Sequence, residues 1–384
     1  MDARNLMAFY EVDVVNGFAG FEAIESEWSE LLSDCEANHP FNTHHWFATW
    51  WRNFGKSSRV SVLVARSRGR LVCCLPLLIA EKNVHPFKAR HLSLWVNTHS
   101  FRSGILCHKD HFACLDEVLN RLVSDPAWDI FDLGYFPAHH ELLRAWKRTM
   151  EKAGIRYLTK PGMKSPRLVI RTTWKEYFTS LSKSRRESVS RKLRKAKKQG
   201  CRVEILRGRT GDLDTRLEQC WEISRKTWKH RIGSSIAADE TRLAFYRDIA
   251  LAEVDWIVLG LIYVNDKPVA FEYDLLYQGV LYNLKLGFDE ATRELSPGYV
   301  LRVALLEWAF DNGIEVFDFM GLEADYKNQF STGVVEHENL TVYNQGALSA
   351  SLYYYQASLD LYRTRIKPSF QRIRGWLQSV SLLR

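Results

Sequence analysis

The feature that most constrains the fold is a run of three strand-like segments between residues 255 and 288. Two short turn signals separate these segments, DKP at 266–268 and QG at 278–279. Turns of this kind between β-branched and aromatic runs are typical of antiparallel hairpins. The sequence therefore predicts a meander of three antiparallel strands, over 255–264, 269–277 and 280–288.

The second turn also predicts a register. With a two-residue loop at 278–279, Asp274 pairs with Asn283 and Glu272 pairs with Lys285. Because side chains alternate between the two faces of a strand, these four polar residues share one face. A polar cluster in the middle of strands predicts a wet cleft that binds a substrate amine or hydroxyl. The alternative is an exposed sheet face with one cross-strand ion pair.

The rest of the chain predicts a mixed α/β fold. Of its 384 residues, 46% are hydrophobic and 26% are charged, which excludes an intrinsically disordered chain. Helices are expected over 21–33, 43–54, 112–124, 142–153, 184–199, 213–225, 240–251, 298–312 and 349–381. Further strands are expected over 60–66, 71–79, 90–95, 130–134, 202–206, 316–320 and 340–344.

A stretch rich in proline, glycine and serine at 160–166 is the predicted domain boundary. The halves on either side of it share the order helix, hairpin, strand, helix, strand. We expect an N-terminal domain over 1–165, a second domain over 166–345 and a basic amphipathic C-terminal helix over 346–384.

Positive charge is concentrated at two places. The net charge is +8, and residues 182–200 alone hold nine basic side chains and one acid. This segment has three interpretations: a solvated surface helix, a docking site for an acidic carrier protein or a tRNA backbone, or a contact with anionic lipid. Nucleic acid is the weaker expectation, because RNA recognition usually adds exposed stacking aromatics and none interrupts this run.

The second basic segment, 360–384, interleaves arginine and lysine with apolar and aromatic residues. A basic helix with tyrosine and tryptophan suits a membrane interface. Packing against the domains explains the same apolar residues. An anionic membrane surface is therefore a candidate partner.

The seven cysteines include no C-x-x-C pair and predict reduced thiols in a cytoplasmic protein. The N-terminus has no signal-peptide pattern, and no apolar run approaches the roughly 20 residues of a membrane-spanning helix. The segment CHKDHFAC at 107–114 contains metal-binding residue types, but its spacing matches no standard structural zinc signature. We expect no metal here and interpret these residues as buried thiols and surface histidines.

The segment RELSPG at 293–298 opens the expected helix 298–312. The N-terminus of a helix presents unpaired backbone N–H groups and the positive end of the helix dipole. The segment therefore predicts an anion site that would suit a pyrophosphate. An ordinary helix start with proline in the first turn is the alternative.

The next segments carry a family resemblance. The strand VFDFMG at 316–321 is followed by Glu323, by Tyr326 and Lys327, and by Phe330. Together with the hairpin and the S-P-G helix start, this order resembles the CelD-like group of GNAT-superfamily acyltransferases. That group is associated with cellulose and exopolysaccharide biosynthesis and is similar to the Fem-type peptidoglycan transferases. The resemblance covers residues 170–345.

This resemblance implies two tandem GNAT-like units, the second of which binds an acyl thioester on a pantetheine arm. Ser296, Gly298 and Tyr299 would then form the pyrophosphate loop of the cofactor site. The implied donor is acyl-CoA. Because this loop has fewer glycines than the usual GNAT phosphate loop, an acyl carrier protein or an aminoacyl-tRNA remains open as donor.

Transfer from a thioester needs a general base near the acceptor and donors for the oxyanion. No Ser/His/Asp or Cys/His motif supplies a covalent nucleophile, so we expect direct transfer in a ternary complex. Either Glu272 or Asp274 is the expected base. Tyr326 would protonate the leaving thiolate, and Lys327 would neutralise a phosphate or carboxylate. The alternative for these two is a partly buried aromatic and a solvated lysine.

Several further residues are candidates for holding the acceptor. Asp318 and Glu323 flank the expected cleft and would orient the acceptor. Substrate binding is also expected from Asn283, Lys285, His44 and Trp46. The last two belong to an aromatic run that would line a cleft between domains, and packing of an aromatic helix face is the alternative.

These observations predict a cytoplasmic N- or O-acyltransferase, for which the inner face of the membrane is a candidate location. It would move an acyl group to an amine or hydroxyl of a lipid or sugar precursor. Some GNAT-like proteins acylate a sphingoid amine to make ceramide, so a long-chain base stands beside polysaccharide precursors as an acceptor. The alternatives are a Fem-like transferase that uses aminoacyl-tRNA and a non-catalytic scaffold in polysaccharide export.

Overall fold

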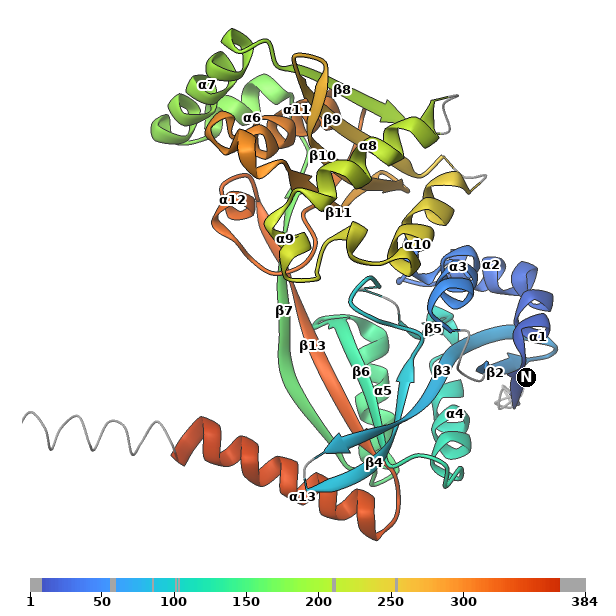
Figure 1. Cartoon of the computed structure of the whole chain (residues 1–384). Coiled ribbons are helices and arrows are strands. Elements are labelled where there is room, and N and C mark those ends of the chain that lie inside the picture. The colour runs from blue at the N-terminus through green and yellow to red at the C-terminus, as the bar shows by residue number, and fades with distance from the viewer. Residues whose placement is uncertain are drawn as a thin grey trace, which may run out of the picture. The chain divides into compact units, whose positions relative to one another are not determined.

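The computed structural model describes residues 9–366, apart from 56–59, 85, 101, 103, 209–211, 253 and 254. The described residues form two compact units (Figure 1). Unit 1 takes its residues from 1–37, 58–162 and 338–384, and unit 2 takes its residues from 38–57 and 163–337. Both contain strands and helices, which confirms the predicted mixed α/β fold. The units are discontinuous, whereas the sequence suggested continuous domains that meet at residue 165.

Unit 1 is built on a mixed sheet with the strand order β1-β2-β3-β4-β6-β13. The strands run antiparallel from β1 to β4, β6 is parallel to β4, and the short β5 pairs with β3. The strands are Tyr10–Asn16 (β1), Ser61–Ser67 (β2), Arg70–Val84 (β3), Phe87–Leu94 (β4), Leu106–Cys107 (β5), Ile130–Pro137 (β6) and Gly333–Tyr343 (β13). The helices are Phe18–Ala23 (α1), Glu25–Ser33 (α2), Cys114–Val123 (α4), Glu141–Lys152 (α5) and Ala347–Leu361 (α13), with a short 3-10 turn at Lys109–His111 and a π turn at Tyr362–Ile366.

The core of unit 1 forms where α4 and α5 bury their apolar faces against this sheet. Leu115 and Leu119 of α4 and Trp146 of α5 pack in one cluster with Leu75 and Leu133 of the strands. Residues three and four apart on a helix lie on one face, so the apolar spacing that predicted both helices also directs these side chains inward.

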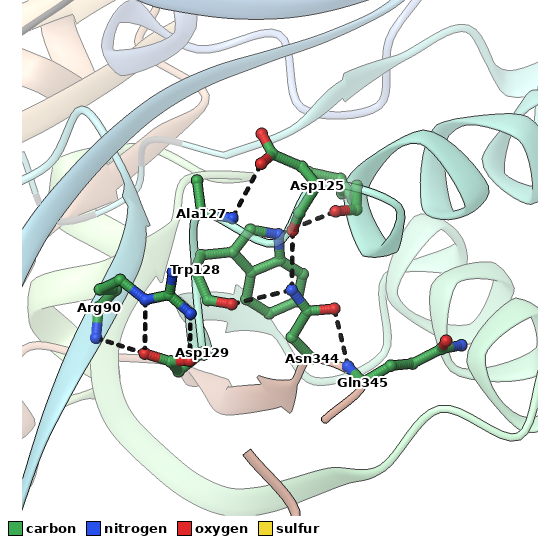
Figure 2. Close-up of polar contacts among 8 residues, drawn as sticks. Arg90, Asp125, Ala127, Trp128, Asp129, Asn344 and Gln345 are labelled. Carbon is green, nitrogen blue, oxygen red and sulfur yellow. Dashed lines mark hydrogen bonds and ion pairs between the residues drawn. The ribbon is translucent and has the colours of Figure 1, made fainter. Parts of the chain in front are cut away.

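The turn between α4 and β6 is held by a residue far away in the sequence. Asn344, just after β13, donates from Nδ2 to the carbonyls of Asp125 at 2.9 Å and Trp128 at 2.8 Å (Figure 2). Beside it, Arg90 of β4 forms an ion pair of 2.7 Å with Asp129. The two bonds from Asn344 satisfy carbonyls of this turn, as buried backbone groups usually require.

Unit 2 carries a mixed sheet with the strand order β7-β12-β11-β10-β9-β8. Its strands are Tyr157–Val169 (β7), Val316–Asp318 (β12), Val280–Phe288 (β11), Lys267–Tyr277 (β10), Ile257–Val264 (β9) and Arg202–Arg207 (β8). Its helices are His44–Trp50 (α3), Trp174–Ser180 (α6), Lys183–Lys198 (α7), Leu213–Arg225 (α8), Trp228–Arg231 (α9), Glu240–Leu251 (α10), Pro297–Asp311 (α11) and Asp325–Asn328 (α12). Shorter turns are Pro40–Asn42, Trp51–Gly55, Ile236–Ala238 and Glu290–Leu295. The chain passes from unit 1 to unit 2 within β7 and returns within β13.

The predicted meander is present as β9, β10 and β11 (Figure 1). Helix α11 covers one face of it so closely that a Cβ on Gly260 of β9 would lie 2.9 Å from Leu305 Cδ1 and 3.0 Å from Leu301 Cδ1. Helix α8 packs on the opposite face, and α10 reaches it where the Tyr273 hydroxyl donates to the Tyr246 carbonyl at 2.8 Å. The alternation along β10 therefore directs Glu272 toward α11 and Tyr273 toward α10.

The predicted register of the β10–β11 hairpin is only half correct. Asp274 pairs with Asn283 as expected, but a β-bulge follows between Tyr273 and Asp274. Beyond it Lys285 pairs with Tyr273, and Glu272 pairs with Leu286. Because the extra residue on β11 changes the alternation, Lys285 lies on the α10 face, with its Nζ 5.5 Å from the Tyr246 ring centroid. The expected pairing of Glu272 with Lys285 is wrong.

Other elements differ from the predicted ranges at their ends. The helix expected over 21–33 is two helices, α1 and α2, divided at Ile24. The strand expected over 316–320 ends at Asp318, because Met320 adopts a left-handed backbone conformation with φ of 52°. The described part of the C-terminal helix is α13 and the π turn after it, and the expected continuation to 381 lies outside the described residues.

Across the described part of the chain, no helix combines the length and the apolar character that crossing a membrane requires.

Candidate functional site

A cavity of about 370 Å³ opens in unit 2 where the β10–β11 hairpin meets the start of α11. Helices α7, α9 and α12 contribute the remaining walls. The lining residues are Lys192, Trp228, Lys229, Glu272, Leu286, Phe288, Arg293, Ser296, Pro297, Gly298, Tyr299, Arg302 and Tyr326. Sequence reasoning had singled out five of them, Glu272, Ser296, Gly298, Tyr299 and Tyr326, without knowing that they share one cavity.

A buried polar network forms one wall of this cavity. The Arg302 Nε of α11 donates to Glu272 Oε1 at 2.9 Å, and the side chains of the pair are only 3% and 1% exposed. Asn283 donates from Nδ2 to Glu272 Oε2 at 3.1 Å and to Asp274 Oδ1 at 2.5 Å. Arg302 Nη2 closes the network by donating to Asn283 Oδ1 at 2.8 Å.

This network corrects the expectation of a wet cleft over the hairpin. Asp274 and Asn283 are buried within the protein and do not line the cavity. Lys285 lies on the other face of the sheet. Glu272 alone among the four predicted residues reaches the cavity, and Arg302 lies against Asn283.

The two carboxyls of the network differ in their electrostatics. Burial raises the pKa of Glu272, while the nearby charges of Arg302 and Lys229 act to lower it. Burial and the charge of Glu272 raise the pKa of Asp274 well above its usual range. Two like charges this close and this buried are unfavourable, so we assign the negative charge to Glu272 and the proton to Asp274.

The cavity carries an excess of positive charge. Lys192, Lys229, Arg293 and Arg302 line it, against the single carboxylate of Glu272. Lys192 places its Nζ 3.5 Å from the ring centroid of Tyr299. Burial lowers the pKa of Lys192 and of Lys229, which weakens but does not remove their preference for a bound anion.

The start of α11 adds to this preference for an anion. Ser296 is the N-cap and has φ of 53°, and Pro297 occupies the first turn. Ser296, Pro297 and Gly298 all line the cavity, so the positive end of a 15-residue helix faces it. Helix α7 borders this loop, because the Lys195 Nζ donates to the Glu294 carbonyl at 2.7 Å.

Three predicted residues lie in the loop and helix that present Tyr326. Asp318 is buried, and its Oδ1 accepts from the Met320 N–H at 2.8 Å. The Lys327 Nζ donates to the carbonyls of Met320 at 2.6 Å and Leu322 at 3.0 Å, and burial lowers its pKa to about 8. Glu323 is exposed. None of the three lines the cavity, so Lys327 is neither the solvated lysine nor the anion ligand that the sequence suggested.

His44 and Trp46 also lie away from the cavity lining. Both are buried in α3. The Trp46 ring meets the ring of Phe41 edge-on with centroids 4.9 Å apart, and it meets Phe245 in the same way at 5.2 Å. These contacts support the packing interpretation of this aromatic run, and substrate binding by His44 and Trp46 stays a prediction.

Sequence reasoning missed Arg302, the lysines Lys192 and Lys229, and Trp228 as parts of one site. The signal for Arg302 was present: it is the one charged residue in the apolar stretch from Tyr299 to Leu306. A charge on the buried face of a helix needs a partner. Its partner could not be named, because it lies 30 residues earlier on a strand.

Residues 183–328 match the family described as "Acetyltransferase (GNAT) domain". This stretch contains every residue that lines the cavity. The chain therefore carries a GNAT-type domain, and the match bears out the expectation of an acyltransferase enzyme. No curated protein sequence matches the chain significantly.

Solved structures that share the fold are distant in sequence. FemX is 13% identical, with a TM-score of 0.54 over 86% of this chain and 98% of FemX. The C-terminal domain (DUF2156) of a candidate lysylphosphatidylglycerol synthetase from Agrobacterium fabrum is 11% identical, with a TM-score of 0.53 over 89% of this chain and 97% of that one. L-PGS from Bacillus licheniformis is 9% identical, with a TM-score of 0.52 over 85% and 94%. At these identities the likeness establishes the fold alone.

Proposed function

We propose that unit 2 binds an acyl thioester, acyl-CoA or an acyl carrier protein, and transfers the acyl group directly to an amine or hydroxyl. The observation that carries the proposal is the composition of the cavity. The positive end of α11 and several cationic side chains lie beside a single buried carboxylate, Glu272. One end of such a cavity suits a phosphorylated carrier, and the carboxylate suits proton transfer.

The donor would lie along the start of α11. Its pyrophosphate would meet Ser296, Gly298 and Tyr299, with Lys192 and Arg293 beside them. Leu286, Phe288 and Trp228 supply an apolar wall for the acyl group or the pantetheine arm. A cavity of about 370 Å³ is large enough for part of such a ligand.

Glu272 is the proposed base, because Asp274 is protonated and does not line the cavity. The acceptor nitrogen or oxygen attacks the thioester carbonyl carbon, and its proton passes to Glu272 directly or through water. The carbonyl electrons form a tetrahedral oxyanion, for which the Lys229 ammonium supplies positive charge. The C–S bond then breaks, and Tyr326 gives its proton to the leaving thiolate.

Burial raises the pKa of the Tyr326 phenol, while the nearby charge of Arg302 acts to lower it, so Tyr326 carries the proton that this step needs. Lys327 and Asp318 act as positioning residues: their bonds to the loop at 320–322 hold the segment that presents Tyr326. Glu323 is exposed on the same loop, where it would attract a protonated amine before transfer.

The rim of the cavity supports a lipid or lipid-linked acceptor. Trp228 and Tyr326 line the cavity and are 45% and 43% exposed. Ile232, directly after α9, and Leu322, before α12, are exposed apolar residues near them in sequence. Helix α7 borders the same cavity through Lys192, and the other lysines and arginines of this helix would attract anionic headgroups. A sphingoid amine fits this rim better than a free sugar, and a lipid-linked sugar of the polysaccharide type is the next candidate.

A second candidate donor is aminoacyl-tRNA, as in a Fem-like transferase. The observation that favours it is again α7, whose N-terminal part reaches α12 through a bond of 3.2 Å from Arg185 Nη1 to the Gln329 carbonyl. A cationic helix beside the cavity suits an RNA backbone as well as an acidic carrier protein. A non-catalytic scaffold would bind neither donor.

Native mass spectrometry separates these donors. The full chain is mixed with acetyl-CoA, long-chain acyl-CoA, free CoA, an acyl carrier protein and a charged tRNA. Saturable binding of a thioester supports the proposal, and activity that is lost on ribonuclease treatment moves the assignment to tRNA. Absence of all binding and all turnover favours the scaffold.

A matched pair of lysine variants tests the placement of the donor. Lys192→Ala removes a cation that lines the cavity, and we expect the donor Kd to rise about tenfold. Lys198→Ala removes an exposed cation at the end of the same helix, and it should leave Kd unchanged within about twofold. Equal effects of the two variants would contradict the assigned cavity.

A further inference from the structure

Three buried cysteines of unit 1 converge on one point, far from the cavity in the sequence. Cys73 lies on β3 and pairs with Cys107 of the neighbouring strand β5. Cys114 is the first residue of α4. All three side chains are buried, and their Sγ atoms lie within 4.8 Å of one another. All three are free thiols.

The spacing of the sulfur atoms suits a shared metal ion. Cys107 Sγ and Cys114 Sγ are 3.7 Å apart. Two thiolates on one tetrahedral Zn²⁺, each with a Zn–S bond of about 2.3 Å, are separated by about 3.8 Å. A disulfide would need about 2.05 Å, so the pair is placed for a common ligand and not for a bond to each other.

The position of one sulfur favours a thiolate. Cys114 begins α4, and a negative charge is favoured at the start of a helix. Soft thiolate ligands of this kind select closed-shell ions such as Zn²⁺ and Cu⁺.

His111 is a candidate for a fourth ligand, although its ring nitrogens lie outside the group of ligand atoms that are within 4.8 Å of one another. It lies between two of the cysteines in the sequence, at Cys107-x₃-His111-x₂-Cys114. Its Nδ1 is 3.3 Å from the Tyr10 hydroxyl. A set of three cysteines and one histidine is a common structural zinc site.

We propose that Cys73, Cys107 and Cys114 bind a soft metal ion of the Zn²⁺ type, with His111 completing the coordination, and that this ion joins β3, β5 and α4 in the core of unit 1. Each thiol gives up its proton to solvent as the ion binds. The apolar residues around the cluster exclude water and substrate, so the ion is structural and takes no part in acyl transfer. The segment CHKDHFAC escaped the zinc signatures because its third thiolate, Cys73, comes from a strand 34 residues before Cys107.

The test is metal content and cobalt spectroscopy of the full chain. The purified protein should contain about one equivalent of zinc, and Co²⁺ loaded in its place should give the charge-transfer absorption of thiolate ligands. Cys107→Ser and Cys114→Ser should reduce the bound metal at least tenfold, and His111→Ala should weaken its retention against a chelator. Cys220→Ser is the matched control, because Cys220 is equally buried but lies in unit 2.

A folded wild-type chain that takes up neither ion would overturn the proposal and would leave the thiols as core packing. Zinc that remains bound at full stoichiometry in folded Cys107→Ser would also overturn it, because the ion would then lie elsewhere. If the serine variants do not fold, the cobalt spectrum of the unsubstituted chain decides by itself. None of these results depends on the activity of unit 2.

Discussion

Arg302→Met is the perturbation that most directly tests the proposed site. The substitution preserves the length of the side chain and its contacts with the apolar core around α11. It removes the 2.9 Å ion pair to Glu272 and the bond to Asn283. Glu272 then keeps Lys229 as the nearby cation that lowers its pKa.

The expected loss of stability at neutral pH is about 3–5 kcal/mol, which is typical for removing one partner of a buried pair. Coulomb's law gives about 4 kcal/mol for unit charges 4 Å apart at an effective dielectric constant of 20. The pKa of Glu272 is already raised in the folded protein. Its protonated form therefore contributes stability that is fully present below the pKa of 4.5 in the unfolded chain. This stability is lost as the pH rises through the pKa in the folded protein. Without Arg302 the folded pKa rises further. The destabilisation should therefore be smallest near pH 4 and should grow toward pH 8.

The pH dependence of the activity gives a second readout, which would not change if Arg302 had a purely structural role. If Glu272 is the base, its protonation produces the acidic limb of the pH–rate profile. Since about 1.4 kcal/mol corresponds to one pH unit, Arg302→Met should move this limb upward by at least about one unit. Arg293→Met is the matched control, because Arg293 lines the same cavity but pairs with Glu290 at the exposed rim. The control should cost less than about 1 kcal/mol and leave the limb in place.

The assays are urea unfolding at several pH values and initial rates with the donor found by mass spectrometry. An acidic limb that stays in place in a folded Arg302→Met protein would refute the assignment of Glu272 as the base. A loss of less than about 1 kcal/mol at pH 8 would refute the buried ion pair itself.

Three further predictions follow from the same geometry. Glu272→Gln should lower kcat by about 10²–10⁴ with little change in the KM for the donor. Asp274→Asn replaces a protonated carboxyl and should change kcat less than about tenfold. Similar losses of kcat in the two variants would contradict the single-base mechanism. Burial lowers the pKa of Lys285 to about 8, so stability should rise as the pH increases from 8 toward 10.5, and Lys285→Met should flatten this dependence in urea titrations while leaving turnover intact. Trp228→Ser should reduce kcat/KM more for long-chain acceptors than for short ones, and equal losses would argue against an apolar acceptor at this rim.

Much of the site region was readable from local sequence. The turn signals at 266–268 and 278–279 correctly predicted the meander and the pairing of Asp274 with Asn283. The S-P-G segment correctly predicted the start of α11. These features are local, because turn geometry, strand alternation and helix capping depend on side chains only a few residues apart.

What the sequence by itself determined is therefore the set of elements and the order in which they occur. The tertiary structure decided which side chains meet. A bulge places Lys285 on the α10 face. Arg302 contacts Glu272 because α11 packs directly over Gly260. Strand pairing brings the Cys73 thiol to Cys107 and Cys114. Each of these outcomes is set by packing between segments far apart in the chain, and the free energy of such packing belongs to the assembled core and not to any one segment.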